Sequence, residues 1–272
     1  MFNRNFAPQI MGILNVTPDS FSDGGLHASS DAALRQAELM IAEGANIIDV
    51  GGESTRPGAD PVPDAEQIRR VVPVIRALHD AYPEMPVSID TMSSVVAEAA
   101  CLAGASIVND VSAGLADTDM LSWVAANDVA IVLMHMQGTP KTMQDDPVYT
   151  DVVGEVINAL QQRIHAAVKS GIKPENIAID PGIGFGKRRQ DNIDLLAHLP
   201  RFVGLGFPVL LGTSRKRFMG SLCNVSDPSE LVTATAVTTG LGVMAGVRIF
   251  RVHDIQANRQ AADLAWAIKQ AQ

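Results

Sequence analysis

The stretch MGILNVTPDSFSDGG, residues 11–25, decides the fold because it changes character at Asn15. Up to that residue the chain is almost continuously apolar, which is typical of a strand covered on both faces of a parallel sheet. After it come mostly small, polar and turn-forming residues, with an aspartate on either side of Phe21. The pattern predicts a buried strand whose carboxyl end opens into a loop rich in polar groups.

The same change from apolar to polar residues recurs along the chain. We expect strands at residues 9–15, 46–50, 86–90, 106–110, 129–135, 177–180, 208–212 and 247–252.

The segments between these strands have the spacing of amphipathic helices. In residues 64–80 apolar side chains recur three and four positions apart, and Asp64 with Gln67 has the spacing of a capping box. Residues 151–170 repeat the apolar pattern. Glycine tolerates the left-handed conformation at a helix end, so helices are expected to stop at three glycines. These are Gly44, Gly104 and Gly171.

Eight strand-plus-helix units follow one another without a linker rich in proline, glycine or serine. This organisation predicts an α/β fold, a single-domain (β/α)₈ TIM barrel over residues 1–272, with the active site at the C-terminal ends of the strands. A doubly wound open sheet is the alternative, because it uses the same alternation of strands and helices.

The composition excludes several classes of protein. With 47% hydrophobic and 19% charged residues, the chain resembles a soluble globular protein rather than a disordered one. Its net charge of −9 argues against nucleic-acid and membrane-surface binding, because phosphate backbones and anionic lipids repel an acidic protein. No apolar run approaches the ~20 residues that span a bilayer. For Cys101 and Cys223 we expect buried free thiols rather than a disulfide, which fits a cytoplasmic location.

Polar residues stand where the expected strands finish. A single such residue is most simply a helix cap or a turn residue, but so many together indicate a site on one face of a barrel. In chain order they are Asn15, Asp49, Asp90, Asn109, His135, Asp180, Ser214 and Arg251.

These residues and their neighbours divide into two chemical sets. Carboxylate and amide groups suit a flat heterocycle with adjacent N–H donors, because a carboxylate accepts two parallel hydrogen bonds. Cations and imidazole suit phosphate or carboxylate. The first set is Asp90, Asn109 and Asp180, and the second is Arg56, Arg215, Lys216, Arg251 and His253.

Other motifs carry less weight. DPGIGFGKR, residues 180–188, lacks the glycine spacing and the Ser or Thr of a P-loop, so we interpret it as a turn-rich loop that brings Phe185 and Lys187 to the barrel mouth. GLGVMAG, residues 240–246, is interpreted as a close-packed helix rather than a dinucleotide fingerprint. His135 and His253 lack a third His or Cys, so we reject a catalytic zinc site.

Eight blocks of the sequence resemble, in order and at suitable spacing, those of the dihydropteroate synthase family. They are MGILNVTPDSFSDGG (11–25), IDVGGESTRPG (48–58), VSIDT (87–91), IVND (107–110), MHMQGTPKTMQ (134–144), DPGIGFGK (180–187), SRK (214–216) and FRVHD (250–254). The resemblance covers the whole chain and implies the same barrel that the strand pattern predicts.

The resemblance implies an enzyme of folate biosynthesis. It would condense 6-hydroxymethyl-7,8-dihydropterin pyrophosphate with p-aminobenzoate to give 7,8-dihydropteroate and pyrophosphate, with Mg²⁺ as cofactor. The aniline nitrogen would attack a pterin carbocation left by pyrophosphate. The loops after Asn15 and at residues 51–58 are expected to close over pyrophosphate. The family further implies inhibition by sulfonamides and a homodimer, whose surface could include residues 236–243.

The resemblance also implies roles for individual residues. The pterin pocket would comprise Asp90, Asn109, Met134, Asp180, Phe185 and Lys216. The pyrophosphate site would comprise Asn15, Thr55, Arg56, Arg251 and His253, with Asn15 beside the metal. The p-aminobenzoate side would comprise Phe21, Thr55, Arg56, Pro57, Phe185, Ser214 and Lys216, where a helix opening at Ser214 would face the substrate carboxylate. The catalytic residues would be Asp90, Lys216, Arg251 and His253.

Two other functions remain open from the sequence. A methyltransferase acting between a folate and a corrinoid would use a similar pterin pocket but has no need of pyrophosphate cations. A pterin-binding paralogue without turnover would keep the same residues. Pyrophosphate release distinguishes the synthase from both.

Overall fold

The computed structural model describes residue 2 and residues 7–16, 25–54 and 58–272, except for the side chains of residues 25–30. Within these ranges the strands lie close to their predicted positions. They are β1 (Gln9–Asn15), β2 (Ile47–Gly51), β3 (Val87–Asp90), β4 (Ile107–Asp110), β5 (Ala130–Met134), β6 (Ile177–Asp180), β7 (Leu210–Leu211) and β8 (Ile249–Val252).

The strands form one parallel sheet that curls into a barrel. Its order is β6-β5-β4-β3-β2-β1-β8-β7, so each strand lies beside its neighbour in the sequence and β1 lies beside β8. The two outer strands meet through a parallel bridge between Ile179 and Val209, and the Ile179 N–H donates to the Pro208 carbonyl at 2.9 Å. The predicted barrel is therefore confirmed, and the open doubly wound sheet was the wrong alternative.

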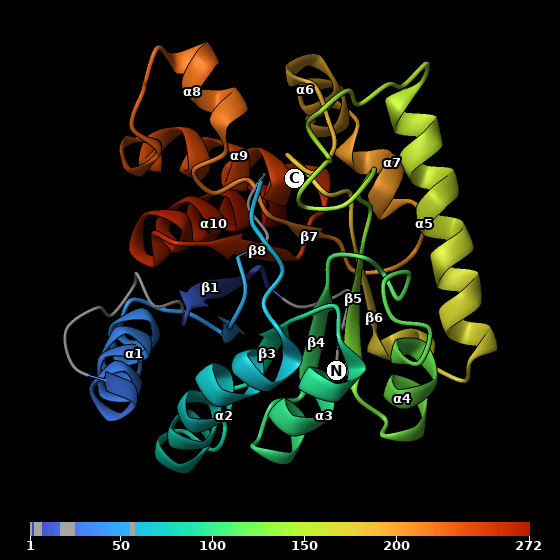
Figure 1. Cartoon of the computed structure of the whole chain (residues 1–272). Coiled ribbons are helices and arrows are strands. Elements are labelled where there is room, and N and C mark those ends of the chain that lie inside the picture. The colour runs from blue at the N-terminus through green and yellow to red at the C-terminus, as the bar shows by residue number, and fades with distance from the viewer. Residues whose placement is uncertain (1, 3–6, 17–24, 55–57) are drawn as a thin grey trace.

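Helices surround the sheet and connect its strands (Figure 1). They are α1 (Gly25–Ala42), α2 (Asp64–Ala81), α3 (Ser94–Leu102), α4 (Met120–Ala126), α5 (Val152–Lys169), α6 (Arg189–Ala197), α7 (Leu199–Val203), α8 (Arg217–Cys223), α9 (Val232–Ala245) and α10 (Ile255–Gln270). Short 3₁₀ turns occupy Pro174–Asn176 and Pro228–Glu230. No helix in the part of the chain that the structure describes is long and apolar enough to cross a membrane.

Two separate apolar clusters show which strand residues point into the barrel. The large cluster lies between the strands and the helices and includes Ile48 and Phe250. The small one includes Ile47, Ile107 and Ile249, one residue away in each strand, and so fills the barrel interior. Two positions further along each strand, the inward side chain is polar. These residues are Asp49, Asn109 and Arg251 on β2, β4 and β8, and the same alternation turns Asp90 and Asp180 inward.

Helix ends and glycines largely follow the predictions. Gly44, Gly104 and Gly171 all have positive φ, between 99° and 121°. At Gly242 an added Cβ would lie 2.7 Å from the Phe250 ring, which confirms the close packing predicted for residues 240–246.

Three local predictions were wrong. The capping box at Asp64 does not form, because Ser93 Oγ donates to its carboxylate while the Gln67 amide turns to the Val62 carbonyl. Strand β7 is shorter than residues 208–212, since Pro208 has no N–H to donate to a ladder. The cysteines are free, as predicted, but not buried: Cys101 is half-buried and Cys223 is exposed at the end of α8.

Candidate active site

Arg251 is the centre of a charged network inside the barrel. Its Nε donates to Asp49 Oδ2 at 2.6 Å and its Nη2 donates to Asp90 Oδ2 at 2.6 Å. Asp49 Oδ2 also accepts a hydrogen bond from the Asn109 amide at 3.2 Å. Side chains from four strands are therefore joined, because the inward alternation of β2, β3, β4 and β8 brings them to adjacent levels of the barrel.

Burial governs the charges of this network. It raises the pKa of Asp90 to about 7, although the positive charge of Arg251 opposes the shift. Burial alone would lower the pKa of Arg251, but the charges of Asp49 and Asp90 outweigh it and raise that pKa. Arg251 therefore stays charged. Asp90 Oδ1 is buried and has no hydrogen-bond partner among the described residues, so a ligand N–H could satisfy it.

Asp180 lies on the same inner face, at the end of β6. Its Oδ1 accepts from the Gly182 N–H at 2.7 Å. A Cβ added to Gly212 would lie 3.9 Å from Asp180 Oδ2 and 4.0 Å from the Arg251 Cβ, so the two side chains flank the same glycine. Burial raises the pKa of Asp180 to about 6, and three cations limit that shift. They are Lys216, Lys187 and Arg251.

The loop after β6 holds Phe185 and Lys187, and the loop after β7 brings Lys216 to the same place. Lys216 Nζ lies 4.2 Å from the centre of the Phe185 ring, a cation–π contact that links this loop to the one after β7. Lys187 Nζ donates to His135 Nδ1 at 3.0 Å and to the Phe185 carbonyl at 3.0 Å. The ring of Phe185 and the ammonium of Lys216 thus face the same end of the barrel as Asp180.

Ser214 and His253 make a second polar contact at the strand ends. The His253 N–H donates to Ser214 Oγ at 3.1 Å, and that Oγ lies 2.9 Å from His253 Nδ1. The contact between Oγ and Nδ1 can form in either tautomer of the imidazole, since the hydroxyl can donate or accept. Arg215 forms an ion pair with Asp254, with Nη2 2.6 Å from Asp254 Oδ1. Its charge is therefore already compensated within the protein.

The expected helix at Ser214 begins later than predicted. Helix α8 starts at Arg217 with Lys216 as its N-cap, and the Lys216 N–H donates to the Thr213 carbonyl. Ser214 itself is buried against His253 rather than at a helix opening. A tight turn takes the place of the first helical turn, because Arg215 has a positive φ of 57°.

Asn15 ends β1, where it and Asp90 flank Gly51 of β2. A Cβ added to Gly51 would lie 3.6 Å from Asn15 Oδ1 and 3.6 Å from the Asp90 Cβ. Within the described residues, no group of three or more His, Cys, Asp or Glu side chains could hold a metal ion. The amide oxygen of Asn15 is a hard ligand of the kind Mg²⁺ accepts, and Mg²⁺ commonly takes its other ligands from water and substrate phosphates.

The structure thus brings most of the predicted site residues together. Asn15, Asp90, Asn109, Asp180, Phe185, Ser214, Lys216, Arg251 and His253 lie at the strand ends, and Met134 ends β5 opposite Asp180. Phe21, Thr55, Arg56 and Pro57 lie outside the described residues.

Two residues have a larger part in the site than their strand-end positions alone predicted. Asp49 is a direct partner of Arg251, and His135 anchors Lys187. The position of Asp49 and His135 at strand ends could be predicted from the sequence, but their side-chain contacts could not.

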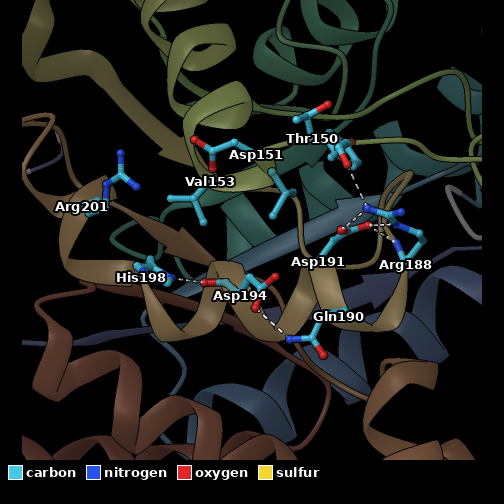
Figure 2. Close-up of a pocket in the computed structure, with 11 residues that line it drawn as sticks. Thr150, Asp151, Val153, Arg188, Gln190, Asp191, Asp194, His198 and Arg201 are labelled. Carbon is cyan, nitrogen blue, oxygen red and sulfur yellow. Dashed lines mark hydrogen bonds and ion pairs between the residues drawn. The ribbon is translucent and has the colours of Figure 1, made fainter.

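A pocket of about 600 Å³ lies elsewhere, between the start of α5 and helix α6 (Figure 2). Its polar groups bond to one another: Arg188 to Asp191, and Gln190 to Asp194. None of the predicted site residues within the described part of the chain lines it. The candidate active site is therefore the set of polar groups at the strand ends.

Comparisons with known proteins show the family of this chain. The model of the pterin binding enzyme family matches residues 11–253. A dihydropteroate synthase of Synechocystis sp. is 44% identical over 268 residues, 98% of this chain and 92% of that protein.

Solved structures of dihydropteroate synthases share the fold. The Yersinia pestis enzyme, solved as a sulfonamide drug complex, has a TM-score of 0.91 at 41% identity, covering 97% of this chain and 95% of that one. The Xanthomonas albilineans enzyme with 4-aminobenzoic acid has a TM-score of 0.90 at 46% identity, covering 98% and 94%.

An eight-stranded barrel with acids, amides and cations gathered at its strand ends is the architecture of an enzyme. The chain belongs to the pterin binding enzyme family, among its dihydropteroate synthases.

Proposed function

We propose that this chain condenses 6-hydroxymethyl-7,8-dihydropterin pyrophosphate with p-aminobenzoate, giving 7,8-dihydropteroate and pyrophosphate. The observation that carries the proposal is the Arg251 network. It places a guanidinium suited to phosphate beside Asp90, whose second oxygen is buried without a partner among the described residues. Arg251 could therefore bind an anion while the neighbouring Asp90 Oδ1 accepts a hydrogen bond from a ring N–H.

The pterin ring is held by the inward acids and amide. Asp180 and Asn109 present acceptors and a donor to the edge of the ring, and Asp90 accepts from it with Oδ1. Met134 and Phe185 supply apolar contacts to the pterin. The Lys216 ammonium lies over the Phe185 ring. Buried acceptors of this kind select a ring that can donate to each, because an unsatisfied one costs about 1–3 kcal/mol.

Pyrophosphate departs toward Arg251 on β8 and His253 just after that strand. Arg251 and His253 donate to its oxygens as the CH₂–O bond breaks, and this interaction strengthens as charge develops on the leaving group. Asp90 stabilises the positive charge left on the pterin. Asn15 would help to hold Mg²⁺, which would neutralise charge on the leaving group.

p-Aminobenzoate approaches from the side of Ser214, Phe185 and Lys216. The Lys216 ammonium is suited to its carboxylate, and the aniline nitrogen attacks the pterin methylene without a covalent enzyme intermediate. Phe21, Thr55, Arg56 and Pro57 are proposed to complete this side. The X. albilineans relative carries 4-aminobenzoic acid in its structure, which supports this choice of substrate.

The test is pyrophosphate release on mixing the dihydropterin pyrophosphate, p-aminobenzoate and Mg²⁺. Release that depends on all three components is expected. A folate and corrinoid methyltransferase or a non-catalytic paralogue would release none. The absence of pyrophosphate release would therefore contradict the proposal.

Sulfonamides should compete with p-aminobenzoate, as the sulfonamide complex of the Y. pestis relative suggests. We expect a sulfonamide to raise the apparent KM for p-aminobenzoate and leave kcat unchanged. A fall in kcat at saturating p-aminobenzoate would contradict binding at the same place.

A homodimer is proposed through α9 and α10. Helix α9 exposes Val237 and Leu241 one turn apart, and α10 exposes Leu264 and Ile268 with the same spacing. Large exposed apolar side chains grouped on neighbouring helices are typical of a surface that a second copy covers. The free cysteines suit the cytoplasm, where we propose that the enzyme acts.

A further inference from the structure

Lys187 is a buried cation that the reaction proposed above does not use. Its residue is only 3% exposed. Its ammonium has three acceptors, namely His135 Nδ1 at 3.0 Å, the Phe185 carbonyl at 3.0 Å and the His135 carbonyl at 3.3 Å. None of these is a carboxylate. A buried charge is costly unless an opposite charge compensates it, so its counter-charge must lie further away.

The Asp180 carboxylate lies beside the same glycine as the Lys187 ammonium, because Asp180 Oδ1 accepts from the Gly182 N–H at 2.7 Å and a Cβ added to Gly182 would lie 3.3 Å from Lys187 Nζ. Asp180 is therefore the counter-charge. Burial lowers the pKa of Lys187 to about 7, and the negative charge of Asp180 is the main influence opposing this. The repulsion of Lys216 adds to the lowering, and Asp191 opposes it more weakly. Asp191 is already paired with Arg188 at 2.8 Å, which leaves Asp180 as the carboxylate that Lys187 chiefly compensates.

The three cations around Asp180 differ in the groups they contact. Arg251 is bound to Asp49 and Asp90, and Lys216 lies over the Phe185 ring. Among the residues that the structure describes, Lys187 has only neutral hydrogen-bond acceptors. His135 is among these neutral groups, because burial lowers its pKa to about 3 and Nδ1 then accepts from the lysine.

The loop between Asp180 and Lys187 is also fixed by contacts that do not involve the lysine. Tyr149 Oη donates to the Gly186 carbonyl at 2.7 Å, and the Gly184 N–H donates to Asn192 Oδ1 at 2.6 Å. Removing the charge of Lys187 therefore leaves much of the loop's support in place, and its electrostatic effect can be measured separately.

We propose that Lys187 is a positioning residue of the pterin site, whose buried ammonium keeps Asp180 ionised as an acceptor for the ring and holds Phe185 on the end of β5. This inference rests on the proposed function, because it takes Asp180 as a pterin ligand. The raised pKa of Asp180, about 6, puts the effect in a measurable range.

The experiment is calorimetric titration with 6-hydroxymethyl-7,8-dihydropterin between pH 5 and 8. This alcohol has no phosphate, so the enzyme's own groups dominate the pH profile. In the unaltered enzyme, affinity should fall as the pH drops through about 6, since the ring binds the ionised form of Asp180. In Lys187→Met the same fall should begin about one pH unit higher, because an opposite charge has been removed.

A matched control is Lys173→Met, which removes an exposed lysine paired with Asp128 and should leave the profile unchanged. If Lys187→Met binds with the midpoint of the unaltered enzyme, Lys187 is merely structural and the inference is wrong. If the unaltered enzyme binds no pterin at any pH, the proposed function itself is wrong.

A second pair of measurements covers the case in which Lys187→Met does not fold. Asp180→Asn keeps the lysine and removes the carboxylate. Because Asp180 raises the pKa of Lys187, the titration of the Lys187 ε-carbon, followed by carbon-13 NMR, should move to lower pH in this variant. An unchanged lysine titration would refute the coupling.

Discussion

At the scale of single residues, the site depends on where each buried carboxylate finds its partners. Asp90 and Asp49 share one guanidinium, while Asp180 has a backbone N–H and several cations at longer range. Burial raises the pKa of both Asp90 and Asp180, so their ionised forms depend on these neighbours. Substitutions that keep the shape and remove the charge therefore test the site most directly.

Asp180→Asn should weaken binding of the dihydropterin by about 2–4 kcal/mol, because a charge-assisted acceptor is replaced by a group that also presents donors. Calorimetry measures the change. Asp194→Asn, on α6 and outside the strand ends, is the control and should leave the affinity unaltered. Equal affinity of Asp180→Asn and the unaltered enzyme would remove Asp180 from the pterin site.

Asp90→Asn should lower kcat, by on the order of 10²-fold, more than it raises KM, since the carboxylate acts chiefly on the developing cation. Steady-state kinetics separates the two constants. Ser88→Ala is a control on the same strand, because that buried hydroxyl has no partner among the described residues. A change confined to KM would make Asp90 a ground-state contact only.

At the scale of elements, the loop from Pro181 to Lys187 is shaped by glycines. Gly182, Gly184 and Gly186 all have positive φ, between 61° and 82°. Such a backbone carries Phe185 and Lys187 toward the end of β5 within a few residues. The motif that lacks the features of a P-loop therefore forms a tight, glycine-rich turn, as its composition predicted.

Gly182→Ala should destabilise the enzyme by about 2–4 kcal/mol. The residue has a φ of 69°, and an added Cβ would overlap the His135 carbonyl oxygen. Chemical denaturation measures the loss. Gly240→Ala is the matched control, because a Cβ there meets nothing within 4 Å, and it should be neutral or slightly stabilising. Equal stability of the two variants would contradict this account of the loop.

At the scale of the whole molecule, barrel closure joins the first strand to the last. β1 pairs with β8 from Gln9–Ile249 to Gly12–Val252, which brings Arg251 to the acids of β2 and β3. The outer helices α9 and α10 are tied by a buried hydrogen bond from Thr239 Oγ1 to Asn258 Oδ1, and their far sides expose leucines.

Leu241→Glu should convert the proposed homodimer to a monomer, because a charge would be buried against the second copy. Light scattering after size-exclusion chromatography gives the mass. Leu102→Glu, an equally apolar and 80% exposed leucine on α3, should keep the dimer. A monomeric unaltered chain, or a dimer that survives Leu241→Glu, would contradict the proposed surface.

Much of the fold could be predicted because parallel strands covered on both faces must be apolar, and their boundaries are marked by glycine, proline and polar residues. The strand at residues 177–180 and the helix ends at glycines could be predicted from the local residue types alone. The capping box at Asp64 failed because the competing partner, Ser93, lies on another helix's N-cap and is invisible to local spacing.

The sequence by itself determined the alternation of strands and helices, the polar strand ends and the chemistry those ends offer. All three follow from residue types and their periods, which act over a few neighbours. Only the tertiary structure decided that Asp49 and Asp90 share Arg251 and that Lys187 rests on His135. Such contacts join residues up to 202 positions apart, and strand register and barrel closure alone set which side chains meet.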